Sequence, residues 1–306
     1  MTNILILADI EGSTTCLKRK DAQLFNDGWV RACVGLTLDL NAICSSLLQA
    51  GATHIRIKDF HRTGYNIFKE LLINGVELDQ GYKVGPATGI GDVSGYHLLM
   101  LVGLHAASGT PGFLPHTLTS KLAEIEVNDH PLCEAELFAA SVAEYGLRPA
   151  FFSGCKEACA QAAWVIPGLK VCEVEKPLTM PVETIRHRLA EKAVEALATF
   201  KSNPDQLPRP YRPAGPFDAR IIMRDGIPAA KKLRKRWHLQ GSDDMIELSA
   251  TDMNALYWQL IRIAYLTPAI CQSLEISLKA ANLAGKIAHL WARRRWQQLK
   301  ISLRDI

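Results

Sequence analysis

Side chains of the two kinds that bind divalent metal ions well, carboxylates and imidazoles, stand at five points in the first half of the chain: Asp9, Glu11, His61, His105 and Glu134. A mixed oxygen and nitrogen set of this kind suits zinc and also accepts manganese or cobalt. Five protein ligands exceed the three that usually hold one catalytic zinc, and they fit two ions, roughly 3.5–4 Å apart, that share a carboxylate. Such a pair lowers the pKa of a water to about 7 and polarises a carbonyl group, so the set predicts hydrolysis with two Zn²⁺ per chain.

Each of these residues also has an ordinary structural explanation when it is taken alone. Asp9 begins a segment, residues 9–13, whose Asp and Ser side chains suit a helix-entry loop. A single histidine is more often a hydrogen-bonded residue than a metal ligand, and Glu134 fits an acid in the first turn of a helix. The placement of all five after successive predicted strands is what favours a metal site.

Four short apolar runs, each leading to candidate ligands, predict strands of one sheet: residues 3–8 before Asp9 and Glu11, residues 53–57 before His61, residues 96–104 before His105, and residues 125–127 before Glu134. In open α/β sheets, ligands collect beyond the carboxyl ends of the strands. Residues two apart in an extended segment face the same side, so Asp9 and Glu11 can converge on one site. We therefore expect all five side chains at the same edge of one sheet.

Strands and helices alternate along the first two thirds of the chain, which is typical of an α/β fold with a mostly parallel sheet flanked by helices. Apolar residues at helical spacing predict helices at about residues 28–49, 65–72, 133–145 and 183–200. This part, residues 1–203, is the predicted metal-binding catalytic α/β domain.

Five prolines then crowd into a short stretch and indicate a linker: Pro204, Pro208, Pro210, Pro213 and Pro216. Beyond them, two strands (219–223 and 245–248) and a helix (252–265) predict a smaller α/β domain over residues 204–272. A final helical segment with apolar residues on one face predicts an amphipathic basic tail over residues 273–306.

The net charge of +4 is unevenly distributed along the chain. Residues 1–200 have a net charge of −5, and residues 201–306 have a net charge of +9. The acidic half suits cation binding. Basic runs beside tryptophans, at residues 231–237 and 293–296, fit a solvated helix face or an oligomer contact, with nucleic acid or anionic lipid as the open alternative. The N-terminus has no signal-peptide pattern and no window holds 18 uninterrupted apolar residues, so we expect a cytoplasmic protein.

Five short segments, taken in order, resemble those of a known family: Leu7-Ala8-Asp9-Ile10-Glu11-Gly12, Lys58-Asp59-Phe60-His61, Gly103-Leu104-His105-Ala106, Thr110-Pro111-Gly112 with His116, and Asn128-Asp129-His130-Pro131-Leu132-Cys133-Glu134. Together they are similar to the zinc-dependent D-aminopeptidases associated with bacterial dipeptide-transport operons, over roughly residues 3–265. Five ordered segments are far more specific than any one of them.

The resemblance divides the candidate ligands between two ions, with Asp9 as the bridge, Glu11 and His61 in one site, and His105 and Glu134 in the other. It implies that His116 is the catalytic histidine, placed to donate to the oxyanion or to move a proton to the leaving amine. It also implies a homo-oligomer, a closed ring with the active sites inside, for which a decamer is one candidate size.

Three places depart from the residues usual in that family. Leu7 and Phe60 stand where serines are common, and Cys155-Lys156 stand where the family tends to carry acidic residues. The candidate ligands are kept while the predicted pocket wall differs. The resemblance therefore supports the metal centre more strongly than it supports a preference for D-residues.

The sequence thus predicts a metallo-aminopeptidase that removes the N-terminal residue of short peptides, D-amino acids among them, by a metal-activated water. Two other interpretations stay open. One is a specialised metallo-amidase of peptide natural-product or cell-wall metabolism, and the other is a non-catalytic protein that binds a partner through its basic C-terminal half. The joint presence of five candidate ligands and His116 favours the enzyme.

Overall fold

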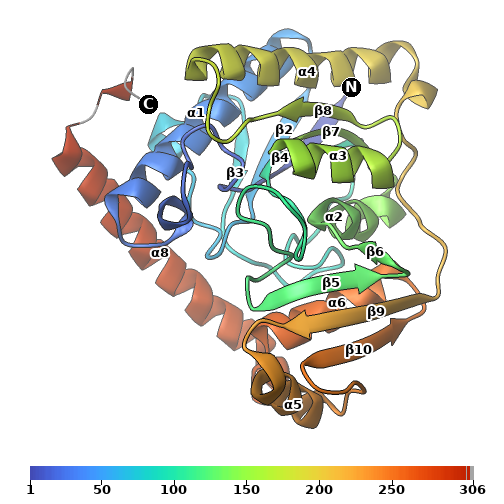
Figure 1. Ribbon diagram of the computed structural model, residues 1–306. Coiled ribbons are helices and arrows are strands. Elements are labelled where there is room, and N and C mark those ends of the chain that lie inside the picture. Colours follow the sequence, from blue (N-terminus) through green and yellow to red (C-terminus); the bar gives the residue numbers. More distant parts are fainter. Residues whose placement is uncertain (301, 304–306) are drawn as a thin grey trace.

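The computed structural model describes residues 1–300, 302 and 303, and within them two β-sheets are packed among helices (Figure 1). The larger one, the main sheet, has the strand order β3-β2-β1-β4-β7-β8, and all of its pairs are parallel. Its strands are β1 (Asn3–Ala8), β2 (His54–Asp59), β3 (Glu77–Asp79), β4 (Leu98–Leu104), β7 (Arg148–Gly154) and β8 (Lys170–Glu173).

The two central strands of the main sheet are buried on both faces. Every residue of β4 is buried, and so are the last five residues of β1. Strands covered on both faces read as continuous apolar runs, which is why residues 4–7 and 98–104 lack the alternation of a half-exposed strand. The predicted α/β fold with a mostly parallel sheet is confirmed.

Helices cover the main sheet on its two faces, as Figure 1 shows. On one face α1 (Asp27–Gln49) packs against α4 (Val182–Ser202), and their apolar side chains share a core with one side of β1 and β4. On the other face lie α2 (Glu134–Val142) and α3 (Lys156–Val165). Short 3₁₀ turns lie at Arg19–Ala22, Lys69–Leu71, Ala143–Tyr145 and Pro204–Gln206.

Helix α1 is long and apolar enough to cross a membrane by length and composition, with a mean hydropathy of 1.3. However, 61% of that window is buried inside the protein, against α4 and the main sheet. The core helix of a globular fold passes the same test, so the apolar character of α1 is explained by its packing.

The smaller sheet, here the second sheet, is antiparallel and has the order β10-β9-β5-β6. It contains β5 (Leu122–Val127), β6 (His130–Pro131), β9 (Phe217–Met223) and β10 (Met245–Ala250), with α5 (Gly226–Trp237) and α6 (Met253–Tyr265) packed beside it. It therefore takes strands from both sides of the predicted boundary at residue 203, and the three-part division of the chain stays a prediction.

The placement of residues 125–127 in the main sheet is wrong, because β5 pairs with β9 instead. The reason is visible in the burial of β5, where Ile125 and Val127 are buried while Glu124 is exposed. A strand that buries alternate side chains has one buried face and one solvent-exposed face. Such a strand does not fit the centre of a parallel sheet that helices cover on both faces.

The C-terminal residues form α7 (Pro268–Gln272) and the long helix α8 (Leu274–Leu299), which crosses α1 near its first turn (Figure 1). Arg295 donates to the Asp27 carboxylate at 2.7 Å, and Asn282 forms two 2.9 Å hydrogen bonds with the backbone of Tyr82. Gly285 faces the ring of Tyr65, where a Cβ atom would come within 2.4 Å. The predicted helical tail thus packs on the body of the fold.

Candidate metal centre

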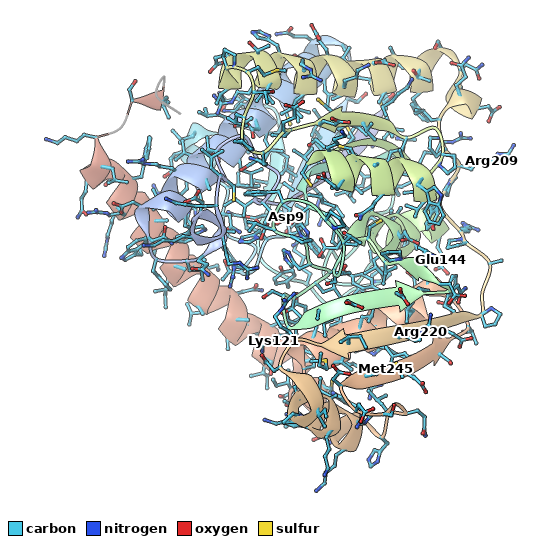
Figure 2. The ribbon with its side chains drawn as sticks, viewed as in Figure 1. Asp9, Lys121, Glu144, Arg209, Arg220 and Met245 are labelled. Carbon is cyan, nitrogen blue, oxygen red and sulfur yellow. The ribbon has the colours of Figure 1, made fainter. Side chains whose placement is uncertain are left out.

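Asp9 lies inside the molecule, between the main sheet and the second sheet (Figure 2), and its two carboxylate oxygens face two different histidines. Oδ1 lies 3.1 Å from Nδ1 of His61, and Oδ2 lies 3.3 Å from Nε2 of His105. Glu11 Oε2 approaches the same His61 nitrogen at 3.0 Å, and Glu134 Oε2 approaches the same His105 nitrogen at 3.6 Å. All five residues predicted from the sequence converge.

The side chains form two groups of possible metal ligands. Within each group, every residue offers one ligand atom, and these atoms all lie within 4.8 Å of one another. The first group contains Asp9, Glu11 and His61, and the second contains His105, His116 and Glu134. Because Asp9 reaches toward both histidines, its carboxylate is the link between the groups. A carboxylate placed in this way could bridge two cations.

Glycine at position 103 allows the loop after β1 to touch the end of β4. Gly103 has φ +77°, and a Cβ there would come within 2.2 Å of the Asp9 carbonyl oxygen. Gly12, whose amide donates to the Gly103 carbonyl at 2.7 Å, has a similar restriction, since its Cβ would meet Leu104 O at 2.3 Å. Only glycine permits this approach, and the approach brings Asp9 beside His105.

The ring of each histidine is held by a backbone carbonyl on the side away from the carboxylates. The pairs are His61 Nε2 with Ala22 O (3.0 Å), His105 Nδ1 with Ala106 O (3.2 Å) and His116 Nδ1 with Leu114 O (2.9 Å). When that nitrogen carries the proton and donates it to the carbonyl, the opposite nitrogen presents a lone pair to the centre. Such an outer hydrogen bond is the usual support of a metal-ligating histidine.

The carboxylates and imidazoles perturb one another strongly. Burial opposes the ionised form of Asp9, but hydrogen bonds with His105 and His61 hold its pKa well below the usual range. Burial also opposes the charge on His61, yet Glu11 and Asp9 raise the pKa of that imidazole to about 10. For Glu134, burial raises the pKa to about 7 against the attraction of His105, with the Asp9 charge adding to the rise.

Glu11 supplies a test of whether the site fits a cation. Its Oε2 atom is buried and makes no well-aligned hydrogen bond among the described residues, although it lies 3.0 Å from His61 Nδ1. A buried carboxylate oxygen with a poorly aligned partner is costly, and a divalent cation between Glu11 and His61 would satisfy it. The donor set of carboxylate oxygens and imidazole nitrogens is the chemistry that zinc takes in proteins, so the residues fit the ions that the sequence predicts.

His116 differs from the other two histidines. Its ring stacks on that of His105, with centroids 3.8 Å apart and planes 7° apart, and its Nε2 lies 4.0 Å from Glu11 Oε1. Burial lowers the pKa of His116 to about 4, and the charge of His105 adds to the effect. The imidazole is therefore neutral near pH 7, with an unprotonated Nε2 facing the carboxylates.

Asp59 holds the loop that carries His61, a role that the sequence analysis did not assign. Its carboxylate accepts from the amides of Asn66 and Ile67, from the Asn66 side chain at 3.0 Å and from the His61 amide at 3.3 Å. These bonds draw residues 65–68 into a loop, so the predicted helix at residues 65–72 is wrong. A buried acid two residues before a candidate ligand was the available signal.

Glu134 reaches the centre from another direction than the predicted one. It is the first residue of α2, which follows β6 of the second sheet, and not a residue at the edge of the main sheet. Its Oε1 accepts from the Leu118 amide at 2.7 Å, which leaves Oε2 turned toward His105. The second sheet thus closes the site over the carboxyl ends of β1, β2 and β4.

Comparison with known proteins agrees with this geometry. The sequence profile of the D-aminopeptidase family matches residues 2–260. A D-aminopeptidase of Bacillus subtilis (strain 168) is 24% identical over 147 residues, which are 47% of this chain and 53% of the relative. The aligned region therefore spans about half the length of that curated relative.

A solved structure has the same fold. It is described as the Zn-dependent D-aminopeptidase DppA from Bacillus subtilis, a self-compartmentalizing protease, and it superimposes with a TM-score of 0.77 at 19% identity. The match covers 87% of this chain and 97% of that one. The family resemblance carried by the five segments is confirmed over nearly the whole chain up to α6, and the chain belongs to the D-aminopeptidase family.

Proposed function

We propose that this protein is a metal-dependent aminopeptidase that hydrolyses the N-terminal peptide bond of short peptides, D-amino acids among them, with two zinc ions per chain. The observation that carries the proposal is the position of Asp9, whose two oxygens face His61 and His105 separately. Membership of the D-aminopeptidase family supports the reaction class. Manganese or cobalt would suit the same donors.

Each ion has its own ligands in this proposal. Glu11 and His61 would hold one ion, His105 and Glu134 the other, and Asp9 would bridge them. The ions, when bound, would act as Lewis acids that polarise the scissile carbonyl group and increase the acidity of a water. The carboxylates are oriented for this by the fold, since Glu134 is fixed by the Leu118 amide and Asp9 by the amide of Ile10 at 2.8 Å.

His116 would move the proton. Because its Nδ1 is engaged with the Leu114 carbonyl and its pKa is lowered to about 4, Nε2 is a free lone pair at neutral pH. It can take a proton from the attacking water and return it to the departing amine, a general base followed by a general acid. Of the two roles that the sequence left open, we therefore propose proton transfer and not oxyanion donation.

The oligomer and the substrate pocket belong to the same proposal. The structurally similar DppA is described as self-compartmentalizing, which supports a homo-oligomeric ring for this chain as well. A ring with enclosed centres would admit short peptides and exclude folded proteins. The decamer size, the cytoplasmic location and the preference for D-residues stay predictions.

One experiment tests the activity. Purified protein, stripped with a chelator and reloaded with zinc, is assayed on matched L- and D-dipeptide amides for release of the N-terminal residue. We expect turnover only after reloading, with about two zinc ions per chain by elemental analysis. Fewer than one ion per chain at zinc saturation, or equal turnover by the stripped protein, would contradict the proposal.

The choice of substrates also separates the two enzymatic interpretations. An aminopeptidase releases the residue that carries a free amine, so N-acetylation of the dipeptide amide should abolish turnover. If the N-acetylated substrate is cleaved as well as the free one, the protein is a broader metallo-amidase and the requirement for an N-terminus is wrong.

A further inference from the structure

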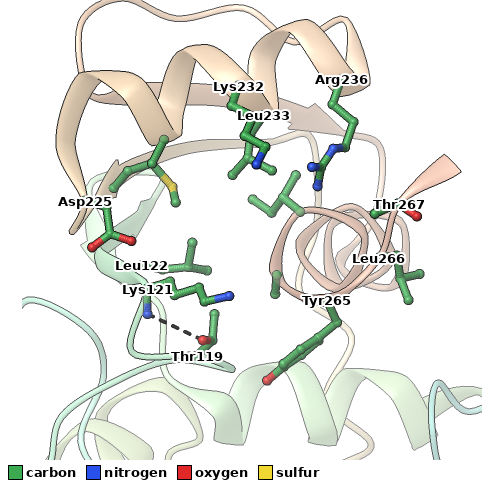
Figure 3. Close-up of a pocket in the computed structure, with 14 residues that line it drawn as sticks. Thr119, Lys121, Leu122, Asp225, Lys232, Leu233, Arg236, Tyr265, Leu266 and Thr267 are labelled. Carbon is green, nitrogen blue, oxygen red and sulfur yellow. Dashed lines mark hydrogen bonds between the residues drawn. The ribbon is translucent and has the colours of Figure 1, made fainter. Parts of the chain in front are cut away.

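A pocket of about 310 Å³ lies between α5, the end of α6 and the start of β5, next to the metal centre but outside it (Figure 3). Three cationic side chains line it: Lys121, Lys232 and Arg236. Figure 3 shows their head groups turned toward the same space, Lys232 and Arg236 from α5 and Lys121 from the opposite wall. We call this the basic pocket.

The three cations of the basic pocket are not neutralised by the protein. Within residues 1–300, 302 and 303, no ion pair joins any of them to an acidic group, although the pocket also contains one acid, Asp225. The lining thus has a net charge of +2. Like charges held around one space repel one another, and an anion between them would remove that repulsion.

The floor of the basic pocket is apolar. Leu122, Met223, Leu233 and Ile263 line it, and each is at most 9% exposed. These side chains offer surface to the apolar part of a ligand, which a free inorganic ion would leave unused.

The basic pocket and the metal centre share a wall. The Tyr265 ring lines the pocket while its hydroxyl donates to the Leu118 carbonyl, and the amide of the same Leu118 holds Glu134. Tyr265 and Leu118 therefore connect the two sites. Ile263, Ala264, Tyr265, Leu266 and Thr267, which supply part of the pocket, lie beyond the region that the family profile matches.

We propose that the basic pocket binds a small organic anion that has a carboxylate or phosphate head and an apolar body. The cations would take the head group by charge-assisted hydrogen bonds, with Arg236 able to offer two parallel donors. The apolar floor would take the body. The anion has two possible sources, a separate ligand or the C-terminal carboxylate of a peptide whose N-terminus lies at the metal centre, and the second source rests on the proposed function.

Binding is measured directly by calorimetry on the full chain, so the test does not depend on activity. The probes are N-acetyl-leucine, which has a carboxylate, and its neutral amide, N-acetyl-leucinamide. We expect the carboxylate to bind and the amide to bind at least about tenfold more weakly, since hydrogen bonds to charged groups are the strong ones. Equal binding of the two probes overturns the proposal.

Two double variants of α5 supply the matched comparison. Lys232→Ala with Arg236→Ala removes two cations of the pocket, whereas Lys231→Ala with Lys235→Ala removes two cations of the same helix that do not line it. We expect the first variant to bind N-acetyl-leucine at least about tenfold more weakly and the second to bind it as the wild type does. Equal losses in both variants would show general attraction to a basic helix and would overturn the pocket.

Lys121→Ala provides an independent check from the opposite wall, in case the α5 variants fold poorly. This variant should also weaken the binding of N-acetyl-leucine.

Kinetics then show the source of the anion. If the pocket takes the C-terminus of the substrate, Lys232→Ala with Arg236→Ala raises KM for a free peptide but not for its C-terminal amide. If both KM values are unchanged while N-acetyl-leucine binding is lost, the anion is a separate ligand. If the zinc-loaded wild type binds N-acetyl-leucine but releases no N-terminal residue from any peptide, the proposed function alone is contradicted.

Discussion

The metal centre and the basic pocket lie on two sides of Leu118, and they are built in opposite ways. In the metal centre every imidazole has a carbonyl behind it and carboxylates in front of it, and the side chains are nearly all buried. In the basic pocket the cations come from an exposed helix and a strand end, and their head groups converge without acidic partners among the described residues. The first site is ordered by the fold, whereas the second leaves its charges to be ordered by a ligand.

This difference has a consequence for mutations. Substitution at a pre-organised site removes both a ligand and a member of a mutually supporting set, so its effects are large and extend to metal content. Substitution at a solvated pocket removes one contact among several and leaves the fold intact. The variants below test that contrast, beginning with the largest effect.

Asp9→Asn should have the largest effect, because it removes a carboxylate whose two oxygens face both histidines. An amide offers a single weak oxygen ligand and cannot neutralise two cations. We expect metal content to fall from two ions to one or none, and peptidase activity to fall by more than about 10³-fold, since metal catalysis contributes several kcal/mol. Elemental analysis and turnover of a dipeptide amide measure the two effects.

The control for Asp9→Asn is Asp92→Asn, at an exposed carboxylate that accepts hydrogen bonds from Ser94. It should keep both metal and activity. Two ions bound to the Asp9→Asn variant would show that the bridge is not needed, and the pre-organised character of the centre would have to be abandoned.

His116→Ala should separate chemistry from metal binding. If His116 moves protons, its loss lowers kcat by about 10²–10³-fold while zinc stays at the wild-type level. The geometry also groups His116 with His105 and Glu134 as a possible ligand. Loss of one ion from the variant would therefore assign His116 to the second metal and would contradict the proton-transfer role.

Asp59→Asn should have a smaller and indirect effect. One of its oxygens would become an amide donor facing the amides of Asn66 and Ile67, so the loop that carries His61 would loosen. Support of this kind is worth about 10–100-fold in metal affinity, measured by competition with a chelator. The matched control is Asp79→Asn, a buried carboxylate paired with Arg56 and Lys58, which should cost stability and leave zinc affinity unchanged.

Four of the five candidate ligands could be located from the sequence because the signal is local. A buried parallel strand reads as an apolar run, and the polar residues at its end mark the edge of the sheet where Asp9, Glu11, His61 and His105 meet. The position of Glu134 was out of reach, because it depends on β5 pairing with β9, some 90 residues further along the chain. Such a partner is chosen by tertiary packing.

The same limit explains the basic pocket and the wrong helix. The cations of α5 were visible as a run, but Lys121 joins them only through the β5–β9 pairing. Residues 65–72 have helical spacing, yet residues 65–68 form the loop that Asp59 holds and Lys69–Leu71 form a 3₁₀ turn. The tertiary contacts of the buried Asp59 fix this loop, and the sequence does not show that Asp59 is buried.

Asn282→Ala should have the smallest effect of the series, and it tests whether the contrast between the two sites is local. Asn282 on α8 makes two hydrogen bonds with the Tyr82 backbone and touches neither the metal centre nor the basic pocket. We expect a loss of about 1–2 kcal/mol in the free energy of unfolding, measured in urea, because the Tyr82 groups lose their partner. Lys286→Ala, at an exposed position of the same helix, should stay within about 0.5 kcal/mol of the wild type.

Zinc content and binding of N-acetyl-leucine should be unchanged in both variants. A change in either would mean that α8 positions a site through the Tyr65 and Tyr82 segment, and the two sites could no longer be treated as independent of the C-terminal helix.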